Sequence, residues 1–272
     1  AWRERDYHGN DFLSEVELFS GNINDELLLR DKLAGTDAVV HLAALTSVVD
    51  SLENPKETWE INVTGTFNLL EACRVNQVKR FVFASSNAVT GEQLPPIDEK
   101  KVPQPLSPYG ASKMAGEALC SAYWHSFGIQ TTSLRFANVY GPYSVHKSSL
   151  IPICLQRIRN REPITIYGDG EQTRDLVHAD DICQAIYLSL TFPGPFGELF
   201  QIASGIETSV NAVVHLLQEI SGDELAVDYQ PARAGEIRRN YSDISKARRI
   251  LKFEPGVELR NGLDRLWQTT LG

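Results

Sequence analysis

Short apolar runs alternate with longer segments of helical periodicity along most of the chain. The runs VELFSGNI (16–23), DAVVHLAAL (37–45), KRFVFASS (79–86) and QTTSLRFANVYGP (130–142) predict strands. Residues 54–77 and the segment from Tyr109 to about Phe127 predict helices. This alternation is typical of a parallel sheet covered by helices, and KRFVFASS is apolar enough to be a strand buried on both faces.

The pattern changes after about residue 147. Residues 148–190 predict a helix, a short strand, a glycine-rich turn and a second helix. Beyond residue 197 we expect a short strand at 199–204 and helices at 209–222 and 261–271. The sequence contains no internal repeat and no low-complexity tract, so one large domain or two interleaved domains are expected.

Composition narrows the class of partner. The 272 residues are 42% hydrophobic and 22% charged, and the net charge is −9, which argues against a nucleic-acid or anionic membrane surface. No apolar run approaches the roughly 18 to 20 residues that span a bilayer, and the first ten residues are too polar for a signal peptide. The scattered Cys73, Cys120, Cys154 and Cys183 favour buried thiols in the cytoplasm over a disulfide or metal framework.

Candidate chemistry gathers where the predicted strands end. HLAALTS, FASSNAVTG and FANVYGP each carry polar residues at the end of an apolar run, and open α/β sheets bind ligands at the carboxyl ends of their strands. In SPYGASKMAGE, Tyr109 and Lys113 are four residues apart and share one helical face. Taken alone, this stretch is better explained as a helix start fixed by Pro108 with a solvated lysine.

These motifs together resemble the extended short-chain dehydrogenases/reductases that act on nucleotide sugars, and within them the UDP-galactose 4-epimerase-like members. The similar stretches also include EINVTGT, ITIYGDGEQTRDLVHADDI and ARAGEIRRNYSDISKA, in family order along almost the whole chain. The resemblance implies an NAD-dependent enzyme with a doubly wound parallel-sheet Rossmann-type domain. We place that domain at residues 1–140, which about 172–195 joins, and a smaller α/β nucleotide-sugar-binding domain at 141–171 and 196–272.

The resemblance assigns three catalytic residues. Tyr109 is the expected general acid/base toward the sugar 4-hydroxyl, and Lys113 is expected to lower its pKa and to contact the nicotinamide ribose, because a nearby cation favours a phenolate. Ser86 is the hydroxyl expected to bond the same sugar oxygen. Ser85 should point the opposite way, since successive strand residues alternate faces.

The positions after Ser86 favour one reaction type. Related 4,6-dehydratases carry an Asp-Glu pair there, whereas this chain has Asn87 and Ala88, which cannot transfer a proton at neutral pH. The related decarboxylases also carry a glutamate near this point. We therefore predict C4 epimerisation of a UDP-sugar; a 4-ketoreductase and a non-catalytic dinucleotide-binding or sugar-nucleotide-binding relative remain alternatives.

Further binding residues follow from the same resemblance. For the cofactor, it implies contacts from Asn22, Ala43, Ala44 and Asn62 in addition to Tyr109 and Lys113. The family usually has an aspartate at the position of Asn22, so the adenine contact is expected to be weaker. Residues expected at the UDP-sugar are Thr46, Asn138, Leu150, Tyr167, Arg174, Arg233, Glu236 and Asn240. Asn240 is expected beside C2 of the sugar, where a residue smaller than tyrosine leaves room for an N-acetyl group.

One family feature has no counterpart in the sequence. The family begins with a strand and a GxxGxxG turn for the cofactor pyrophosphate. We expect that the first βα unit is missing and that the sequence is an N-terminally incomplete record of a longer protein; a genuinely truncated relative is the alternative. The choice between NAD and NADP rests on that segment. In the family that the sequence resembles, the counterparts of the helices at 54–76 and 109–127 pair across a two-fold axis, so the resemblance implies a homodimer.

Overall fold

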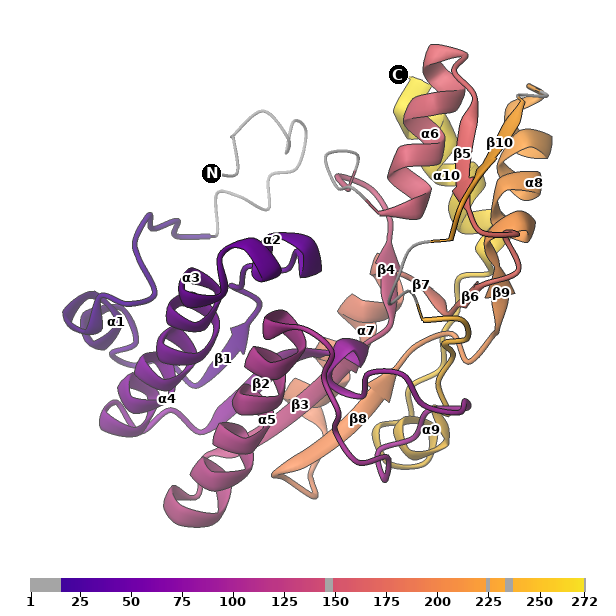
Figure 1. Ribbon diagram of the computed structural model, residues 1–272. Coiled ribbons are helices and arrows are strands. Elements are labelled where there is room, and N and C mark those ends of the chain that lie inside the picture. The colour runs from indigo at the N-terminus through magenta and orange to yellow at the C-terminus, as the bar shows by residue number, and fades with distance from the viewer. Residues whose placement is uncertain (1–15, 145–148, 224–225, 233–236, 272) are drawn as a thin grey trace.

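The computed structural model describes residues 16–144, 149–223, 226–232 and 237–271, and these form two lobes (Figure 1). The larger lobe is built on a four-stranded parallel sheet with the order β1-β2-β3-β8. Its strands are β1 (Ala38–His41), β2 (Arg80–Ser86), β3 (Gln130–Phe136) and β8 (Glu198–Ile202). In the part of the chain that the structure describes, β1 pairs on one side only, with β2.

Helices cover both faces of this sheet. One face carries α1, α4 and α5, whose apolar side chains meet Phe81 and Phe83 in one buried cluster. The other face carries α7 and α9, which pack on Val82 and Leu134. The bounds are α1 (Glu26–Lys32), α2 (Val48–Glu53), α3 (Pro55–Trp59), a π-helical turn η3 (Glu60–Thr64), α4 (Gly65–Val75), a 3-10 turn η4 (Asn87–Val89), α5 (Pro108–Phe127), α7 (Ala179–Thr191) and α9 (Ser245–Leu251). The sheet is therefore doubly wound, as the alternating pattern predicts.

The smaller lobe has a core of its own. Its elements are α6 (Leu150–Asn160), β5 (Ile164–Tyr167), α8 (Val210–Ser221), β10 (Val227–Gln230) and α10 (Leu259–Leu271). Ile151, Leu155, Ile166 and Val213 are buried together in this core. Short strands connect the lobes: β4 (Asn138–Tyr140), β6 (Thr173–Arg174), β7 (Leu176–His178) and β9 (Thr208–Ser209). β4 pairs with β7, and β6 pairs with β9.

The helix that carries the Tyr109 motif has clear start and stop signals. The Ser107 hydroxyl accepts a hydrogen bond from the N–H of Gly110, and Pro108 occupies the first turn. The helix ends at Gly128, whose φ of 74° suits a residue without a Cβ. Gly116 lies against the ring of Phe83, so α5 approaches β2 closely at this point. The sequence fixes both ends of this helix and its close contact with the strand.

Three expectations need correction. Residues 16–23 do not form a strand: they lack strand structure, and Leu18 and Phe19 are exposed. The stretch is apolar enough, but no strand is paired with it among the described residues, and backbone pairing is what makes a strand. The assignment of all of 196–272 to the smaller domain is wrong at β8, which pairs with β3 in the large sheet, and at α9, which packs on it. Cys183 is exposed, whereas the other three cysteines are buried free thiols.

Candidate active site

Ser86 and Tyr109 meet at the carboxyl end of β2. The side-chain oxygen of Ser86 accepts a hydrogen bond from the N–H of Ala88 at 3.2 Å, which leaves its own proton free to be donated. The side chains of Ser86 and Tyr109 are both buried and neighbour each other. Burial raises the pKa of Tyr109, and the nearby Ser86 hydroxyl acts in the opposite direction because hydrogen bonding to the phenol stabilises the phenolate.

Lys113 lies one helical turn after Tyr109 and is also buried. Its ammonium group donates to the carbonyl oxygen of Ala84 at 2.7 Å and stands 5.0 Å from the ring centre of Phe83. Burial lowers the pKa of Lys113 to about 8. In this structure burial dominates the pKa of Tyr109, and the Lys113 ammonium donates to Ala84.

A buried ion pair joins α5 to β3, the strand next to β2. Arg135 on β3 contacts Glu117 on α5 through two hydrogen bonds, from Nε and Nη2, both of 2.7 Å. The hydroxyl of Ser85 also donates to Glu117. Ser85 therefore belongs to this ion-pair network and Ser86 to the hydroxyl pair, as the alternation of strand faces predicts.

Asn62 joins the loop after β1 to the catalytic helix. Its side-chain amide exchanges hydrogen bonds of 2.8 and 2.9 Å with the backbone of Leu45, and it donates to the hydroxyl of Ser112 at 3.0 Å. Ser112 in turn donates to the carbonyl of Tyr109 at 2.8 Å. Asn62 lies in the π-helical turn, a local widening that often marks functional sites. It braces the loop that carries Ala43, Ala44 and Thr46.

The predicted cofactor residues occupy different surroundings. Ala43 and Ala44 follow β1 at the carboxyl edge of the sheet, where Ala43 is exposed and Ala44 half-buried. Asn22 is exposed in the turn before α1, and its side chain accepts from the N–H of Asn24 at 2.9 Å. The small side chains, the buried ammonium of Lys113 and the phenol of Tyr109 fit the nicotinamide-ribose end of a dinucleotide.

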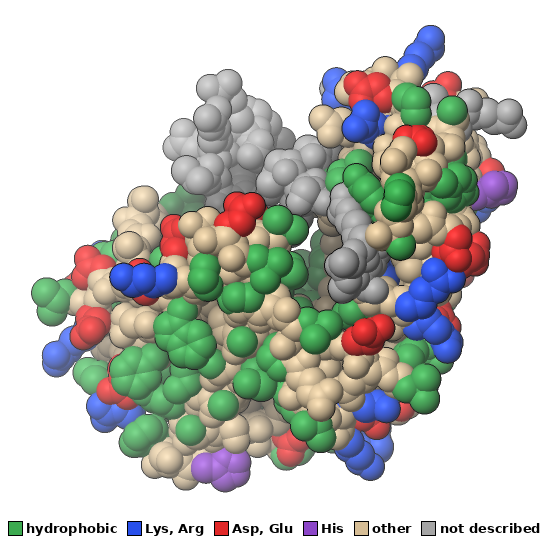
Figure 2. All heavy atoms as spheres, in the orientation of Figure 1, with side chains coloured by type: hydrophobic (Ala, Val, Ile, Leu, Met, Phe, Trp, Pro, Cys, Tyr) green, Lys and Arg blue, Asp and Glu red, His purple; other side chains and the backbone are tan. Residues whose placement is uncertain are grey.

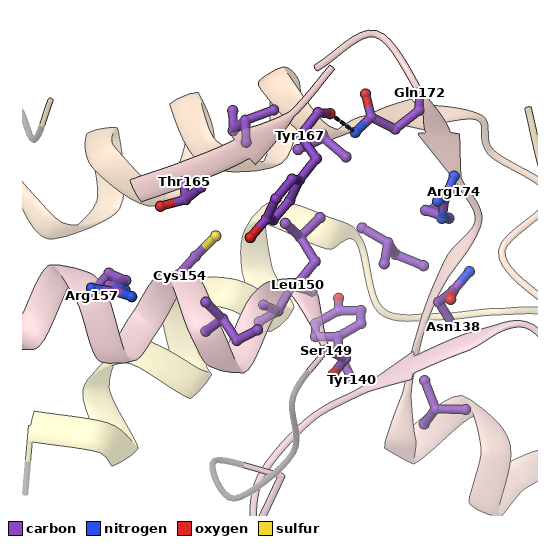
Figure 3. A pocket seen from close by; sticks show the side chains of 16 residues that line it. Asn138, Tyr140, Ser149, Leu150, Cys154, Arg157, Thr165, Tyr167, Gln172 and Arg174 are labelled. Atoms are coloured by element: carbon purple, nitrogen blue, oxygen red, sulfur yellow. Dashed lines mark hydrogen bonds between the residues drawn. The ribbon is translucent and has the colours of Figure 1, made fainter. Parts of the chain in front are cut away.

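A cavity of about 430 Å³ lies in the smaller lobe between α6 and β5 (Figure 3). It contains four of the predicted substrate residues: Asn138, Leu150, Tyr167 and Arg174. Asn138 and Arg174 lie next to each other at one end, and the Tyr167 ring points from β5 toward α6 (Figure 3). Arg174 donates to the backbone carbonyls of Thr173 and Ile237, at 2.7 and 2.9 Å. Because β3 pairs with β2 and leads into Asn138, this end of the cavity lies near the Ser86 edge of the sheet.

Asn240 is connected directly to the strand end that carries Ser86. Its Oδ1 accepts a hydrogen bond from Asn87 at 3.2 Å, and its side chain is buried. Tyr241 faces elsewhere, with its ring 6.0 Å from the Arg239 guanidinium. Arg233 and Glu236 lie outside the described residues. Thr46 is exposed in the loop after β1 and does not line the cavity.

The structure adds residues that the sequence analysis missed. The cavity is also lined by Ser149, Cys154, Arg157, Thr165 and Gln172, and Gln172 donates to the carbonyl of Tyr167 at 2.8 Å. The amphipathic pattern of α6 places Leu150 and Cys154 on one face, and this spacing could have indicated them.

Buried His41 contacts Thr66 at 2.9 Å, and burial, together with the charge of Lys113, lowers its pKa to about 3. His41 is therefore neutral at physiological pH.

The described residues hold neither a metal cluster nor a membrane-spanning helix. Within the four described ranges, no three His, Cys, Asp or Glu side chains converge in a way that could hold a metal ion. Over the same residues, no helix is both long and apolar enough to cross a bilayer.

A parallel, doubly wound sheet with a Ser-Tyr-Lys set at its carboxyl edge defines a dehydrogenase/reductase type of site. A sequence model of the NAD dependent epimerase/dehydratase family matches residues 1–203, and the chain belongs to this family.

Individual relatives and solved structures are similar to this chain over most of its length. The chain is 37% identical over 245 residues to the uncharacterized UDP-glucose epimerase YtcB of Bacillus subtilis (strain 168), covering 89% of this chain and 77% of that protein. The crystal structure of UDP-glucose 4-epimerase from Thermotoga maritima with UDP-glucose is similar with a TM-score of 0.89 and 34% identity, covering 93% of this chain and 85% of the other. UDP-N-acetylglucosamine 4-epimerase from Methanobrevibacter ruminantium M1, in complex with UDP-N-acetylmuramic acid, gives a TM-score of 0.92 and 29% identity, covering 97% and 85%.

Proposed function

We propose that the protein epimerises a UDP-sugar at C4 in an NAD-dependent reaction, through a transient 4-keto sugar. The observation that carries this proposal is the set of three buried side chains at the carboxyl end of the sheet: Ser86 at the end of β2, with Tyr109 and Lys113 one turn apart on α5. The pair can hold one sugar hydroxyl between a hydrogen-bond donor and an acid/base. The relatives named as UDP-sugar 4-epimerases support the same reaction.

Each residue of the site is proposed to have its own role in the reaction. Tyr109 takes the proton of the sugar 4-hydroxyl and later returns it, and Ser86 holds the same oxygen in place. NAD, when bound, would supply the hydride acceptor and donor that oxidation and re-reduction at C4 require. Lys113 provides positive charge on the side of Tyr109 at pH values below about 8, where its ammonium is charged. Ala43, Ala44, Asn22 and the Asn62-braced loop are proposed to hold the cofactor.

The residues after Ser86 favour epimerisation over elimination. Asn87 and Ala88 occupy η4, and the side chain of Asn87 donates to Asn240. An amide and a methyl group cannot remove a C5 proton or protonate a leaving 6-hydroxyl. A 4-ketoreductase would use the same Ser86, Tyr109 and Lys113, so the distinction lies in whether the cofactor is consumed.

The nucleotide is proposed to bind in the cavity of the smaller lobe. Tyr167 would lie beside the uracil, with Leu150 on the facing helix, while Arg174 and Asn138 would hold the pyrophosphate end. A guanidinium group suits a pyrophosphate because it stays charged and donates two parallel hydrogen bonds. Thr46, Arg233 and Glu236 complete the proposed set of substrate contacts.

Asn240 is proposed to set which sugars fit. It is buried, and it bonds to the residue that directly follows Ser86, so it lies on the catalytic side of the segment 237–242. Because asparagine is smaller than tyrosine, we propose that N-acetylated UDP-hexoses are accepted together with UDP-glucose and UDP-galactose.

The protein is proposed to act as a cytoplasmic homodimer. Large apolar side chains gather on the face formed by α3, α4 and α5 (Figure 2), where Trp59, Phe67 and Phe127 are 50%, 45% and 54% exposed. Contiguous exposed apolar surface of this kind marks an association site, and pairing two copies of this face would form a four-helix bundle. The scattered cysteines with three buried free thiols suit the reducing cytoplasm.

The test of the function is interconversion of substrate and product by the purified full chain. UDP-glucose supplied with NAD should yield UDP-galactose without accumulation of NADH, and Tyr109→Phe should abolish nearly all of this turnover. Stoichiometric consumption of reduced cofactor with a UDP-4-keto sugar, with no interconversion of UDP-glucose and UDP-galactose, would instead identify a 4-ketoreductase.

A further inference from the structure

Asp175 is a fully buried carboxylate at the junction of the two lobes, between β6 and β7. Its Oδ1 accepts hydrogen bonds from the N–H and the hydroxyl of Ser204, at 2.8 and 2.6 Å. Its Oδ2 accepts from the N–H groups of Gly205 and Ser242, both at 3.1 Å. Burial raises the pKa of Asp175 although all four bonds act to lower it. Keeping this carboxyl group in the interior is therefore costly, and the four donors converge on it from two distant segments.

Asp175 itself and the segment of Ser242 lead to residues of the proposed substrate site. The backbone carbonyl of Asp175 accepts from both the N–H and the side chain of Asn138, at 3.0 and 3.3 Å. Arg174 directly precedes Asp175, and Asn240 lies two residues before Ser242. Asp175 thus bonds directly to Asn138. It is the chain neighbour of Arg174, and it bonds to Ser242, which lies two residues after Asn240.

The segment 237–242 is held against 173–175 along its whole length. At its start, Arg174 donates to the carbonyl of Ile237 and the N–H of Thr173 donates to the carbonyl of Arg238. At its end, the N–H of Ser242 donates to the carboxylate of Asp175. Asn240 lies between these two attachments, so its position depends on both.

We propose that Asp175 is a positioning residue of the substrate site for one ligand, a uridine diphosphate-sugar: its backbone carbonyl holds Asn138, and its carboxylate fixes the junction that carries Arg174 and the segment that carries Asn240. The inference rests on the proposed function for the identity of that ligand. Asp175 is not expected to touch the substrate: its carboxylate oxygens are occupied by Ser204, Gly205 and Ser242. It acts through the residues that it holds.

Asp175→Asn is the sharpest test because it preserves shape. The new amide group places an N–H where two donors now point, so the variant loses contacts on one side of the carboxyl group only. We expect the Kd for UDP, measured by calorimetry on the full chain, to rise about tenfold, and the KM for the UDP-sugar to rise similarly. The kcat should change much less, since Ser86, Tyr109 and Lys113 lie on other elements.

Asp181→Asn is the matched control. Asp181 is also buried and also accepts from backbone N–H groups, those of Gly256 and Val257, at 2.7 and 3.4 Å. The variant Asp181→Asn makes the same chemical change at a carboxylate that bonds to none of the proposed substrate residues. We expect it to lower the Tm with the Kd for UDP unchanged.

The milder variant Ser204→Ala covers the case in which Asp175→Asn does not fold. It removes one of the four bonds to the carboxylate and should raise the Kd for UDP two- to threefold, on the order of a single neutral hydrogen bond. A wild-type Kd in a folded Asp175→Asn or Ser204→Ala protein, whatever its Tm, would overturn the proposal, as would an equal rise in Asp181→Asn. Wild-type protein that binds UDP but turns over no UDP-sugar would overturn the proposed function alone.

Discussion

The ammonium group of Lys113 donates a hydrogen bond to the carbonyl oxygen of Ala84 at 2.7 Å, in a position shielded from solvent. Burial lowers the pKa of Lys113 from its usual value of 10.5 to about 8. Between these two pH values the unfolded chain binds a proton that the folded chain does not. Stability contributed by this group therefore rises with pH across that window, because the unfolded state binds more protons.

The direction of this pH dependence gives a prediction for the variant Lys113→Met. Relative to that variant, wild-type protein should gain up to about 3 kcal/mol in the free energy of unfolding as the pH rises from 8 to 10.5. Urea denaturation of both proteins at several pH values measures the difference, and other titrating groups cancel in it. A difference that is constant or that falls over this range would show that Lys113 is not desolvated.

Tyr109→Phe tests the acid/base assignment. The variant removes only the phenolic hydroxyl beside Ser86, so we expect turnover to fall by about 10² to 10⁴. Binding of UDP, measured by calorimetry, should stay unchanged because the nucleotide cavity is lined by other residues. Near-wild-type turnover would remove Tyr109 from the mechanism.

Asn240→Tyr tests the sugar subsite. We expect it to remove turnover of N-acetylated UDP-hexoses selectively, since the larger ring would fill the space beside Asn87. The ratio of kcat/KM for acetylated and plain substrates reports this directly, and activity on UDP-glucose serves as the folding control. If the wild type rejects acetylated sugars and Tyr241→Ser accepts them, Tyr241 rather than Asn240 lines the pocket.

Phe67→Glu tests the proposed dimer. Phe67 is exposed on α4, and its ring contacts that of Tyr123 on α5. A charge at the centre of the apolar face should convert the dimer to monomers at micromolar concentration by light scattering. Tyr187→Glu, at an exposed aromatic residue on α7, is the matched control and should remain dimeric. A wild-type protein that is monomeric at this concentration would contradict the proposal.

The sequence predicted the elements whose signals are local. Ser107, Pro108 and Gly128 mark both ends of α5, and the continuous apolar run of β2 predicts a strand buried on both faces, as found. The ends of β1, β2 and β3 were identified as a ligand edge, and Ser86, Tyr109, Asn62 and Asn138 lie there or next to it. Periodicity and capping depend on neighbouring residues, so they can be read along the chain.

Features that depend on distant partners could not be predicted in the same way. The stretch 16–23 has the apolar composition of a strand but no paired strand in the described ranges, and β8 joins the large sheet through β3. The pKa of Tyr109 depends on how deeply the phenol is buried and on where the Lys113 ammonium turns, and spacing on a helix determines neither. The bond between Asn87 and Asn240 joins residues 153 positions apart, and no sequence motif contains it.

The most direct test of the account follows the hydrogen at C4. UDP-glucose labelled with deuterium at C4 is incubated with the full chain and NAD, and the UDP-galactose formed is analysed by NMR. The account predicts that the deuterium stays at C4 of the product, because the same hydride leaves and returns within one site, and that Tyr109→Phe forms almost no product. Absence of UDP-galactose, or product whose C4 deuterium has exchanged with solvent, would contradict it.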